Sequence, residues 1–141
     1  MTYAKIDERT IASLRQIVGP NNLITDHDTL ENYSHDETPL YKSMPEVVLK
    51  PTSTDQVSQV MKLAFDLNIP VTPRGGGTCL SAGAVPVHGG IVLSLEKMTK
   101  IKEIDTDNMM VVTETGIVTE RRDRNLWSIN CALILLDFLY K

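Results

Sequence analysis

The sequence predicts an α/β fold that is followed by the start of an antiparallel lobe, so the whole chain could also be classed as α+β. Two observations support this prediction. Amphipathic helical patterns at 7–18 and 54–67 alternate with short apolar runs at 46–50, 69–73 and 91–94. Continuous apolar runs joined by helices are typical of parallel strands that are buried on both faces. Beyond them, residues 101–105 alternate in period two and a turn at 106–108 leads into the segment 109–114, which indicates a hairpin and the start of an antiparallel lobe.

The composition indicates a soluble globular protein of one ordinary domain. The 141 residues are 42% apolar, and a net charge of −4 with a pI near 5.3 gives no basic field for nucleic acid. The cysteines, Cys79 and Cys131, have no metal-type spacing, and the N-terminus has no apolar signal region, so the cytoplasm is the expected compartment. The longest unbroken apolar run, 131–136, is far too short for a membrane span.

Residues 1–45 are expected to form a helical arm. A helix over 7–18 has Asp7 as its cap and a stripe of apolar residues on one face, namely Ile11, Leu14 and Val18. A second short helix is expected to begin at Asp28, which has capping-box spacing with Glu31.

Within this arm, three acid or base residues follow the second helix, namely His35, Asp36 and Glu37. They could form a metal or acid–base site. Adjacent residues on an irregular segment seldom converge on one point, so a solvated turn is the favoured interpretation.

A βαβ unit is expected over 46–73. The strand 46–50 ends at Pro51, and Ser53 begins a capping box for a helix that runs to about Leu67. The side chains expected to lie on a sheet are Val57, Val60, Met61, Ala64 and Leu67. The second strand, 69–73, delivers Gly75 to its carboxyl end, which is where open α/β sheets bind ligands.

Residues 73–90 hold six of the eight glycines of the chain. Consecutive glycines at 75–77 are expected where the backbone needs a positive φ or where a ligand approaches the main chain closely. Successive N–H groups in such a turn bind phosphate oxygens, and nearby side chains could add donors, namely Arg74, Thr78 and Ser81. The segment therefore predicts a pyrophosphate-binding loop.

Two common nucleotide-binding patterns are excluded. A P-loop requires Lys followed by Ser or Thr after its last glycine, but Ala84 and Val85 follow Gly83. The dinucleotide fingerprint requires a third small residue where Leu80 stands, followed by a helix, which the later glycines and Pro86 forbid. The loop is therefore expected to connect two strands.

The segments 73–84 and 89–94 resemble the pyrophosphate loop of the FAD-linked oxidases related to vanillyl-alcohol oxidase. Within that group the sequence is most similar to the flavin subunit of glycolate oxidase and to the D-lactate and D-2-hydroxyglutarate dehydrogenases. The resemblance covers roughly 46–119 and implies a small parallel βαβ subdomain that binds FAD noncovalently. It implies the cofactor-binding residues Arg74, Gly75, Gly76, Gly77, Thr78, Cys79, Leu80, Ser81, Gly83 and Gly116.

Some residues of this loop have competing interpretations. Arg74 is either a pyrophosphate clamp or a surface residue. Cys79 is interpreted as a small buried filler rather than a nucleophile, since no histidine lies near it in the sequence. His88 could tether a flavin covalently, as a histidine does in some relatives, but its position beyond residues 81–83 favours a surface turn.

The resemblance ends near Thr119. The tail, 120–141, differs in character, and 126–139 could form an apolar helix, which suggests a truncated or frame-shifted copy that self-associates through this tail. Catalytic residues of the family come from a cap domain, so none is named here. The expected role is the N-terminal FAD-binding part of a flavin-dependent 2-hydroxy-acid dehydrogenase or oxidase, inactive alone. The alternative is a non-catalytic module that binds another nucleotide or phosphate or a partner.

Overall fold

The computed structural model describes residues 3–117 and 132–133. The chain divides into two compact units, Met1–Lys97 and Met98–Lys141. This division falls inside the segment 46–119 that the sequence suggested as one subdomain. The arm of residues 1–45 belongs to the first unit, because its backbone and side chains are hydrogen-bonded to the strands and loops of that unit.

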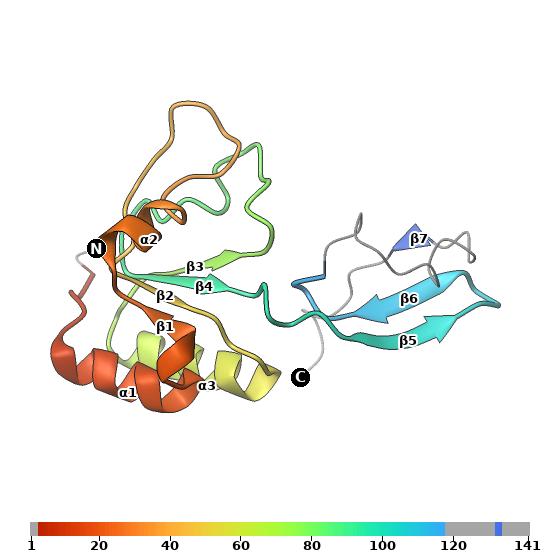
Figure 1. The fold of residues 1–141 in the computed structure, drawn as a ribbon, viewed down its shortest axis with the longest axis horizontal. Coiled ribbons are helices and arrows are strands. Elements are labelled where there is room, and N and C mark those ends of the chain that lie inside the picture. Colours follow the sequence, from red (N-terminus) through yellow and green to blue (C-terminus); the bar gives the residue numbers. More distant parts are fainter. Residues whose placement is uncertain (1–2, 118–131, 134–141) are drawn as a thin grey trace. The chain divides into compact units, whose positions relative to one another are not determined.

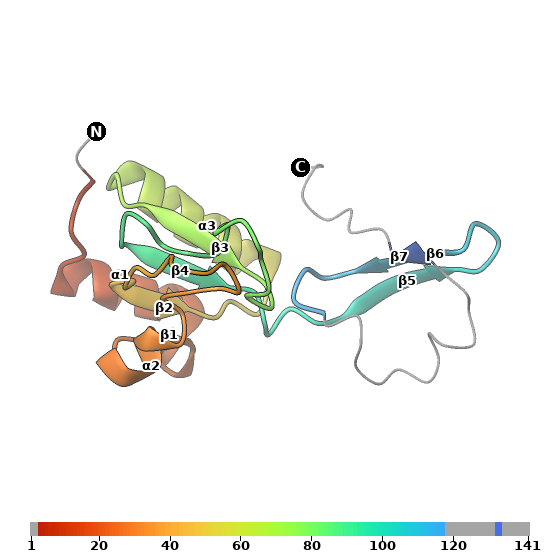
Figure 2. The same cartoon turned by 90° about the horizontal axis from the view of Figure 1, so that it is seen from above.

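The first unit is built on a four-stranded sheet with the order β1-β2-β4-β3 (Figure 2). The bounds are β1 (Leu23–Ile24), β2 (Val47–Leu49), β3 (Val71–Arg74) and β4 (Ile91–Ser94). Strands β2, β4 and β3 are parallel, while β1 pairs antiparallel with β2 at the edge. The predicted α/β class is therefore confirmed, and the short edge strand β1 was not predicted.

The predicted βαβ unit is correct in direction but incomplete in topology. Strand β4 lies between β2 and β3, so the two strands of the unit are not neighbours. Every residue of β4 is buried, which suits a central position, whereas β3 contains Pro73. Because proline has no N–H to donate to a ladder, a strand that contains it is found at the edge of a sheet.

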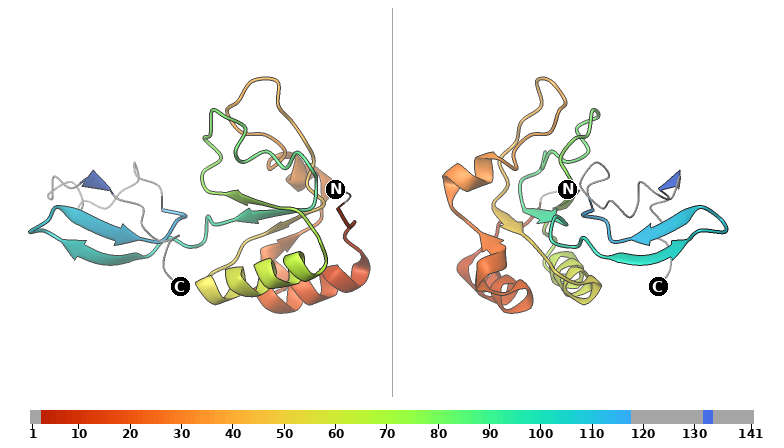
Figure 3. Two further views of the ribbon diagram at one scale, coloured as in Figure 1. Left: turned by 180° about the vertical axis from the view of Figure 1, so that it is seen from behind. Right: turned by 45° about the vertical axis from the view of Figure 1, so that its right-hand side comes forward.

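Helices cover one face of this sheet, where α1 (Glu8–Val18) and α3 (Thr54–Asp66) lie side by side (Figure 1, Figure 3). The short α2 (His27–Glu31) lies on the opposite face, and the 3-10 turn η1 (Pro20–Asn22) leads into β1. On the α2 face, Leu30 packs with Val48 and Val92. Side chains alternate along a strand, so the buried neighbours of the latter two face α1 and α3.

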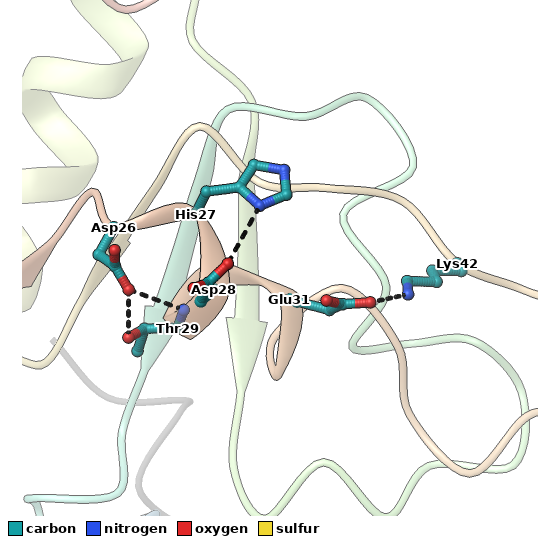
Figure 4. A network of polar contacts seen from close by, with 6 residues as sticks. All are labelled: Asp26, His27, Asp28, Thr29, Glu31 and Lys42. Atoms are coloured by element: carbon teal, nitrogen blue, oxygen red, sulfur yellow. Dashed lines mark hydrogen bonds and ion pairs between the residues drawn. The ribbon is translucent and has the colours of Figure 1, made fainter.

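Two of the three helix caps follow the prediction. The Asp7 carboxylate accepts from the N–H of Thr10 at 2.8 Å, and Ser53 Oγ accepts from the N–H of Gln56 at 3.3 Å. The cap of α2 is Asp26, which accepts from the N–H and the hydroxyl of Thr29 (Figure 4). The expected cap at Asp28 is therefore wrong, because Asp26 has the extended backbone of a capping position while Asp28 already lies in the first turn.

Helix α3 buries a narrower stripe than its periodicity predicts. Val60 and Ala64 are buried, but Met61 and Leu67 are 46% and 40% exposed, so their expected place on the sheet is wrong. Phe65 is 86% exposed. Since α3 packs beside α1, its contact stripe centres on Val60 and Ala64, and Met61 lies at the margin of this stripe.

The second unit contains the predicted hairpin. Strands β5 (Ile101–Asp105) and β6 (Met110–Thr113) pair antiparallel, and the turn between them is held by the N–H of Asn108, which donates to Asp105 at 2.9 Å. Strand β7 (Ala132–Leu133) pairs parallel with β6. These two residues are therefore a strand and not part of the helix suggested for 126–139, and the rest of that segment lies outside the described residues.

Candidate functional site

The glycine loop leaves the carboxyl end of β3 and returns to the start of β4 (Figure 1). Residues 35–45 form a second loop that rises beside it from the α2 side (Figure 1, Figure 3). Hydrogen bonds from Thr38 to both Cys79 and Ala82 confirm that the two loops are in contact. The predicted strand-to-strand connection is confirmed, and it lies at the carboxyl ends of the parallel strands, the edge where open α/β sheets in general bind ligands.

A continuous run of backbone donors is the main chemical feature of this loop. No N–H group over residues 75–81 donates to another described residue, whereas those of Ala82, Ala84 and Val85 all do. The hydroxyl groups of Thr78 and Ser81 also have no hydrogen-bond partner in the described part of the chain. Such a set of groups can donate hydrogen bonds to the oxygens of a pyrophosphate.

The glycines of the loop are needed for different reasons. Gly77 has φ +72°, and a Cβ there would overlap the guanidinium of Arg74. Gly76 does not have a positive φ, and a Cβ there would make an ordinary van der Waals contact with the Thr78 side chain at 3.9 Å. The positive φ expected for a glycine run is therefore found at Gly77 and not at Gly76.

Arg74 connects the loop to the arm. Its Nη1 donates to the carbonyl of His35 at 2.6 Å and its Nη2 to the carbonyl of Asn32 at 3.4 Å. Its guanidinium lies 5.6 Å from the centre of the Tyr33 ring, within cation–π range. Arg74 thus fixes the C-terminal end of α2 against the start of the glycine loop.

Asp36 is not part of a solvated turn, contrary to the favoured interpretation of the sequence. Asp36 is buried, with only 7% relative exposure, and its carboxylate accepts from the N–H of Thr38 at 2.9 Å and of Ala84 at 3.3 Å. Its neighbours His35 and Glu37 are exposed. Within the described part of the chain, no group of acid, histidine or cysteine side chains could hold a metal ion.

Opposing effects act on the pKa of Asp36. Burial of the carboxylate favours the neutral acid, while hydrogen bonds from Thr38 and Ala84 and the charge of Arg74 favour the anion. The second group of effects is stronger, so the pKa of Asp36 lies below its ordinary value. Asp36 is therefore an anion at neutral pH, and it is suited to hold N–H groups rather than to donate a proton.

A charged network that sequence reasoning missed lies at the same edge of the sheet. Lys50 Nζ is 2.8 Å from Glu96 Oε1, and the Glu96 carboxylate also accepts from Ser94 at 2.8 Å and from Tyr33 at 3.2 Å. Burial opposes both charges, yet these contacts raise the pKa of Lys50 and lower the pKa of Glu96. The available signal was position, since Lys50 follows β2 directly and Glu96 follows β4 after one residue.

The remaining loop residues differ in exposure and in surroundings. Cys79 is exposed, so its expected role as a buried filler is wrong, and Leu80 is 77% exposed. His88 is exposed in a turn, as expected, with its ring 5.1 Å from that of Tyr3. Gly116 belongs to the second unit, where its N–H donates to the carbonyl of Met98 at 2.8 Å.

Residues 45–134 match the sequence model of a family described as an FAD binding domain. The chain belongs to this FAD-binding domain family. It is 38% identical over 106 residues to the glycolate oxidase subunit GlcD of Bacillus subtilis, and 38% identical over 117 residues to a D-lactate dehydrogenase of Anaerostipes hadrus. The matches cover 75% and 82% of this chain but only 23% and 24% of those relatives.

Solved structures show the same fold for the FAD-binding domain. The crystal structure of p-cresol methylhydroxylase with substrate bound superposes with a TM-score of 0.69 at 26% identity, over 77% of this chain and 22% of that one. A 4-ethylphenol oxidase from Gulosibacter chungangensis in its isoeugenol complex gives 0.68 at 23% identity, over 83% and 24%. The predicted family and fold are therefore confirmed. None of the helices in the described residues has the length and apolarity needed to cross a bilayer.

Proposed function

We propose that the glycine loop of this FAD-binding domain holds the pyrophosphate of FAD, with residues 75–81 as the main donors and without a covalent bond. The observation that carries this proposal is the run of N–H groups from 75 to 81 that donate to no described residue. The hydroxyl groups of Thr78 and Ser81, which have no hydrogen-bond partner in the described part of the chain, support it. The position of His88, beyond residues 81–83, supports noncovalent binding.

The larger role that we propose is the FAD-holding part of a flavin-dependent dehydrogenase or oxidase that acts on a small 2-hydroxy acid of the glycolate or D-lactate type. The names of the relatives support this substrate class. A bound flavin supplies the redox chemistry, by accepting a hydride from the substrate, while the protein supplies binding and orientation. The described residues contribute the pyrophosphate donors and the charged edge of Lys50 and Glu96.

The 141 residues alone are expected to bind FAD weakly and to show no turnover of glycolate, D-lactate or D-2-hydroxyglutarate. The chain corresponds to only 23% of the length of the glycolate oxidase subunit it matches. Hydride transfer needs the substrate held against the flavin ring, and a pyrophosphate loop does not provide that contact. A cytoplasmic location and self-association through 126–140 belong to the same proposal.

Thermal unfolding with FAD, FMN, NAD or ATP tests the cofactor assignment. A ligand that binds only the native state adds about 2.7 kcal/mol of stability at a hundredfold excess over its Kd. FAD is expected to raise the melting temperature most, because it offers both the pyrophosphate and the flavin. An equal response to ATP, with no preference for FAD, would favour a general phosphate-binding module instead.

A further inference from the structure

Residues outside the glycine loop form hydrogen bonds with its backbone. The segment 35–38, which we name the brace, reaches it from the α2 side with one buried carboxylate and one hydroxyl. The Thr38 hydroxyl accepts from the N–H of Ala82 at 2.7 Å and donates to the carbonyl of Cys79 at 3.3 Å. The Asp36 carboxylate accepts from the N–H of Ala84 at 3.3 Å.

Ala82 shows why the loop needs such support. It has φ +55°, a left-handed conformation that costs a residue with a side chain about 1–2 kcal/mol. Its N–H is held by Thr38 and its carbonyl accepts from Val85 at 3.2 Å, so both sides of the strained peptide are fixed. Residues 75–81 lie between this point and Arg74.

The brace belongs to the second loop, residues 35–45, and contacts outside the brace anchor the base of that loop. The N–H of Ser43 donates to the carbonyl of Ser34 at 2.8 Å, and Lys42 pairs with Glu31 of α2, which closes the base of the second loop (Figure 4). Arg74 donates to the carbonyl of His35, which precedes the brace carboxylate. The brace therefore contacts the glycine loop at its beginning, through Arg74, and at its end, through Ala82 and Ala84.

We propose that Thr38 and Asp36 are positioning residues that hold the 75–81 loop in the shape that binds pyrophosphate. Neither needs to touch the ligand. Their hydrogen bonds engage Ala82 and Ala84, which directly follow the free donors, and leave every N–H of residues 75–81 available. This inference rests on the proposed function for its consequence, weaker FAD binding, but the brace itself is measurable without FAD.

The test compares Thr38→Val, which keeps the shape but removes the hydroxyl, with Thr38→Ser, which keeps the hydroxyl. Thr52→Val is the matched control, because within the described residues the Thr52 hydroxyl bonds only Gln56, at 3.2 Å, and no residue of the glycine loop. Amide hydrogen exchange at Ala82 in the FAD-free protein reports the brace directly, and the Kd for FAD reports its consequence. Thr38→Val is expected to speed the exchange and to weaken FAD binding about tenfold each, while Thr38→Ser and Thr52→Val change neither by more than about twofold.

A merely structural role of Thr38 is excluded by measuring FAD binding well below the melting temperature. Loss of global stability leaves the Kd of a fully populated native state unchanged. Unchanged exchange at Ala82 in Thr38→Val would overturn the brace, and faster exchange with an unchanged Kd would overturn the positioning role. If the unmodified protein binds no FAD, the proposed function and the positioning role both fail, while the exchange rate still decides whether the brace exists.

Asp36→Asn provides a second variant in case Thr38→Val does not fold. An asparagine keeps one oxygen for the N–H of Thr38 but turns an NH₂ donor toward another donor, the N–H of Ala84. Faster exchange at Ala84 and a Kd at least tenfold weaker are expected. Equal exchange and equal affinity in this variant would contradict the brace.

Discussion

Alanine substitutions at two neighbouring glycines of the loop allow an effect on FAD binding to be distinguished from an effect on folding stability. A Cβ at Gly76 would make only an ordinary contact with Thr78, at 3.9 Å and without a positive φ, while a Cβ at Gly77 would overlap the Arg74 guanidinium at a φ of +72°. Gly76→Ala is therefore expected to leave the free energy of unfolding within about 0.5 kcal/mol of the parent. Gly77→Ala is expected to lower it.

The magnitude for Gly77→Ala follows from its local contacts. A left-handed φ costs a residue with a Cβ about 1–2 kcal/mol. Displacement of Arg74 also weakens its hydrogen bond to the His35 carbonyl, worth about 1 kcal/mol for a solvent-exposed pair. The total of about 2–3 kcal/mol corresponds to a fall of roughly 10 °C in melting temperature for a domain of this size.

Thermal melts without ligand and FAD titrations by fluorescence give the two readouts. Under the proposed function, Gly76→Ala is expected to melt like the parent but to bind FAD at least tenfold more weakly, because the new methyl group stands within the run 75–81 that we propose binds the pyrophosphate. Gly19→Ala is the control, since Gly19 also has a positive φ, +86°, but lies away from the loop, with no atom nearer than 3.9 Å to a new Cβ. It should lose stability and keep its FAD affinity. Equal FAD affinity in the parent, Gly76→Ala and Gly77→Ala would refute the assignment of the loop.

Other predictions concern strain, charge and packing. Ala82→Val is expected to lower the free energy of unfolding by more than about 1 kcal/mol, because φ +55° suits a β-branched residue poorly, while Ala82→Gly stays near the parent in chemical denaturation. The pKa of Asp36 is lower in the folded protein than in the unfolded chain, so the ionised carboxylate stabilises the fold at pH values above the unfolded pKa. This contribution is lost as the pH falls through the folded pKa. The difference in free energy of unfolding between the parent and Asp36→Asn, measured in urea, should therefore narrow below about pH 4. Val60→Ala, at a fully buried site, should lower the free energy of unfolding by about 1–3 kcal/mol, and Phe65→Ala, at an 86% exposed site, should lower it by less than about 0.5 kcal/mol in the same assay. A larger loss for Phe65→Ala than for Val60→Ala would contradict the observed buried face of α3.

The elements that the sequence predicted well are those set by local chemistry. Asp7 and Ser53 cap their helices as expected, because a capping side chain bonds an N–H only a few residues away. The hairpin of β5 and β6 follows from alternation and a turn. The glycine loop was also predictable, because a positive φ such as that of Gly77 depends on the identity of that one residue.

The order of the strands was not predicted, because pairing joins residues that are distant in the sequence. The helix 54–66 connects β2 to β3, and a simple βαβ unit would place them side by side. Strand β4 separates them instead. A signal was present, since Pro73 marks β3 as an edge strand and the unbroken apolar run of β4 marks a central one, but it becomes decisive only when all three strands are compared.

The support of the loop was hidden for the same reason, and this has a consequence for how the site works. Thr38 and Ala82 are 44 residues apart, and Asp36 and Ala84 are 48 apart, so no local pattern relates them. The backbone donors of residues 75–81 could therefore be predicted from the sequence. The residues that support this segment lie in a different part of the first unit and could not. Hydrogen bonds join Arg74 to the C-terminal end of α2 and to the brace, and an ion pair joins Lys42 to Glu31 of α2. A substitution that destabilises α2 should therefore also destabilise the glycine loop, even when no glycine is changed. FAD affinity should thus depend on the order of the arm as well as on the glycine residues that the ligand approaches.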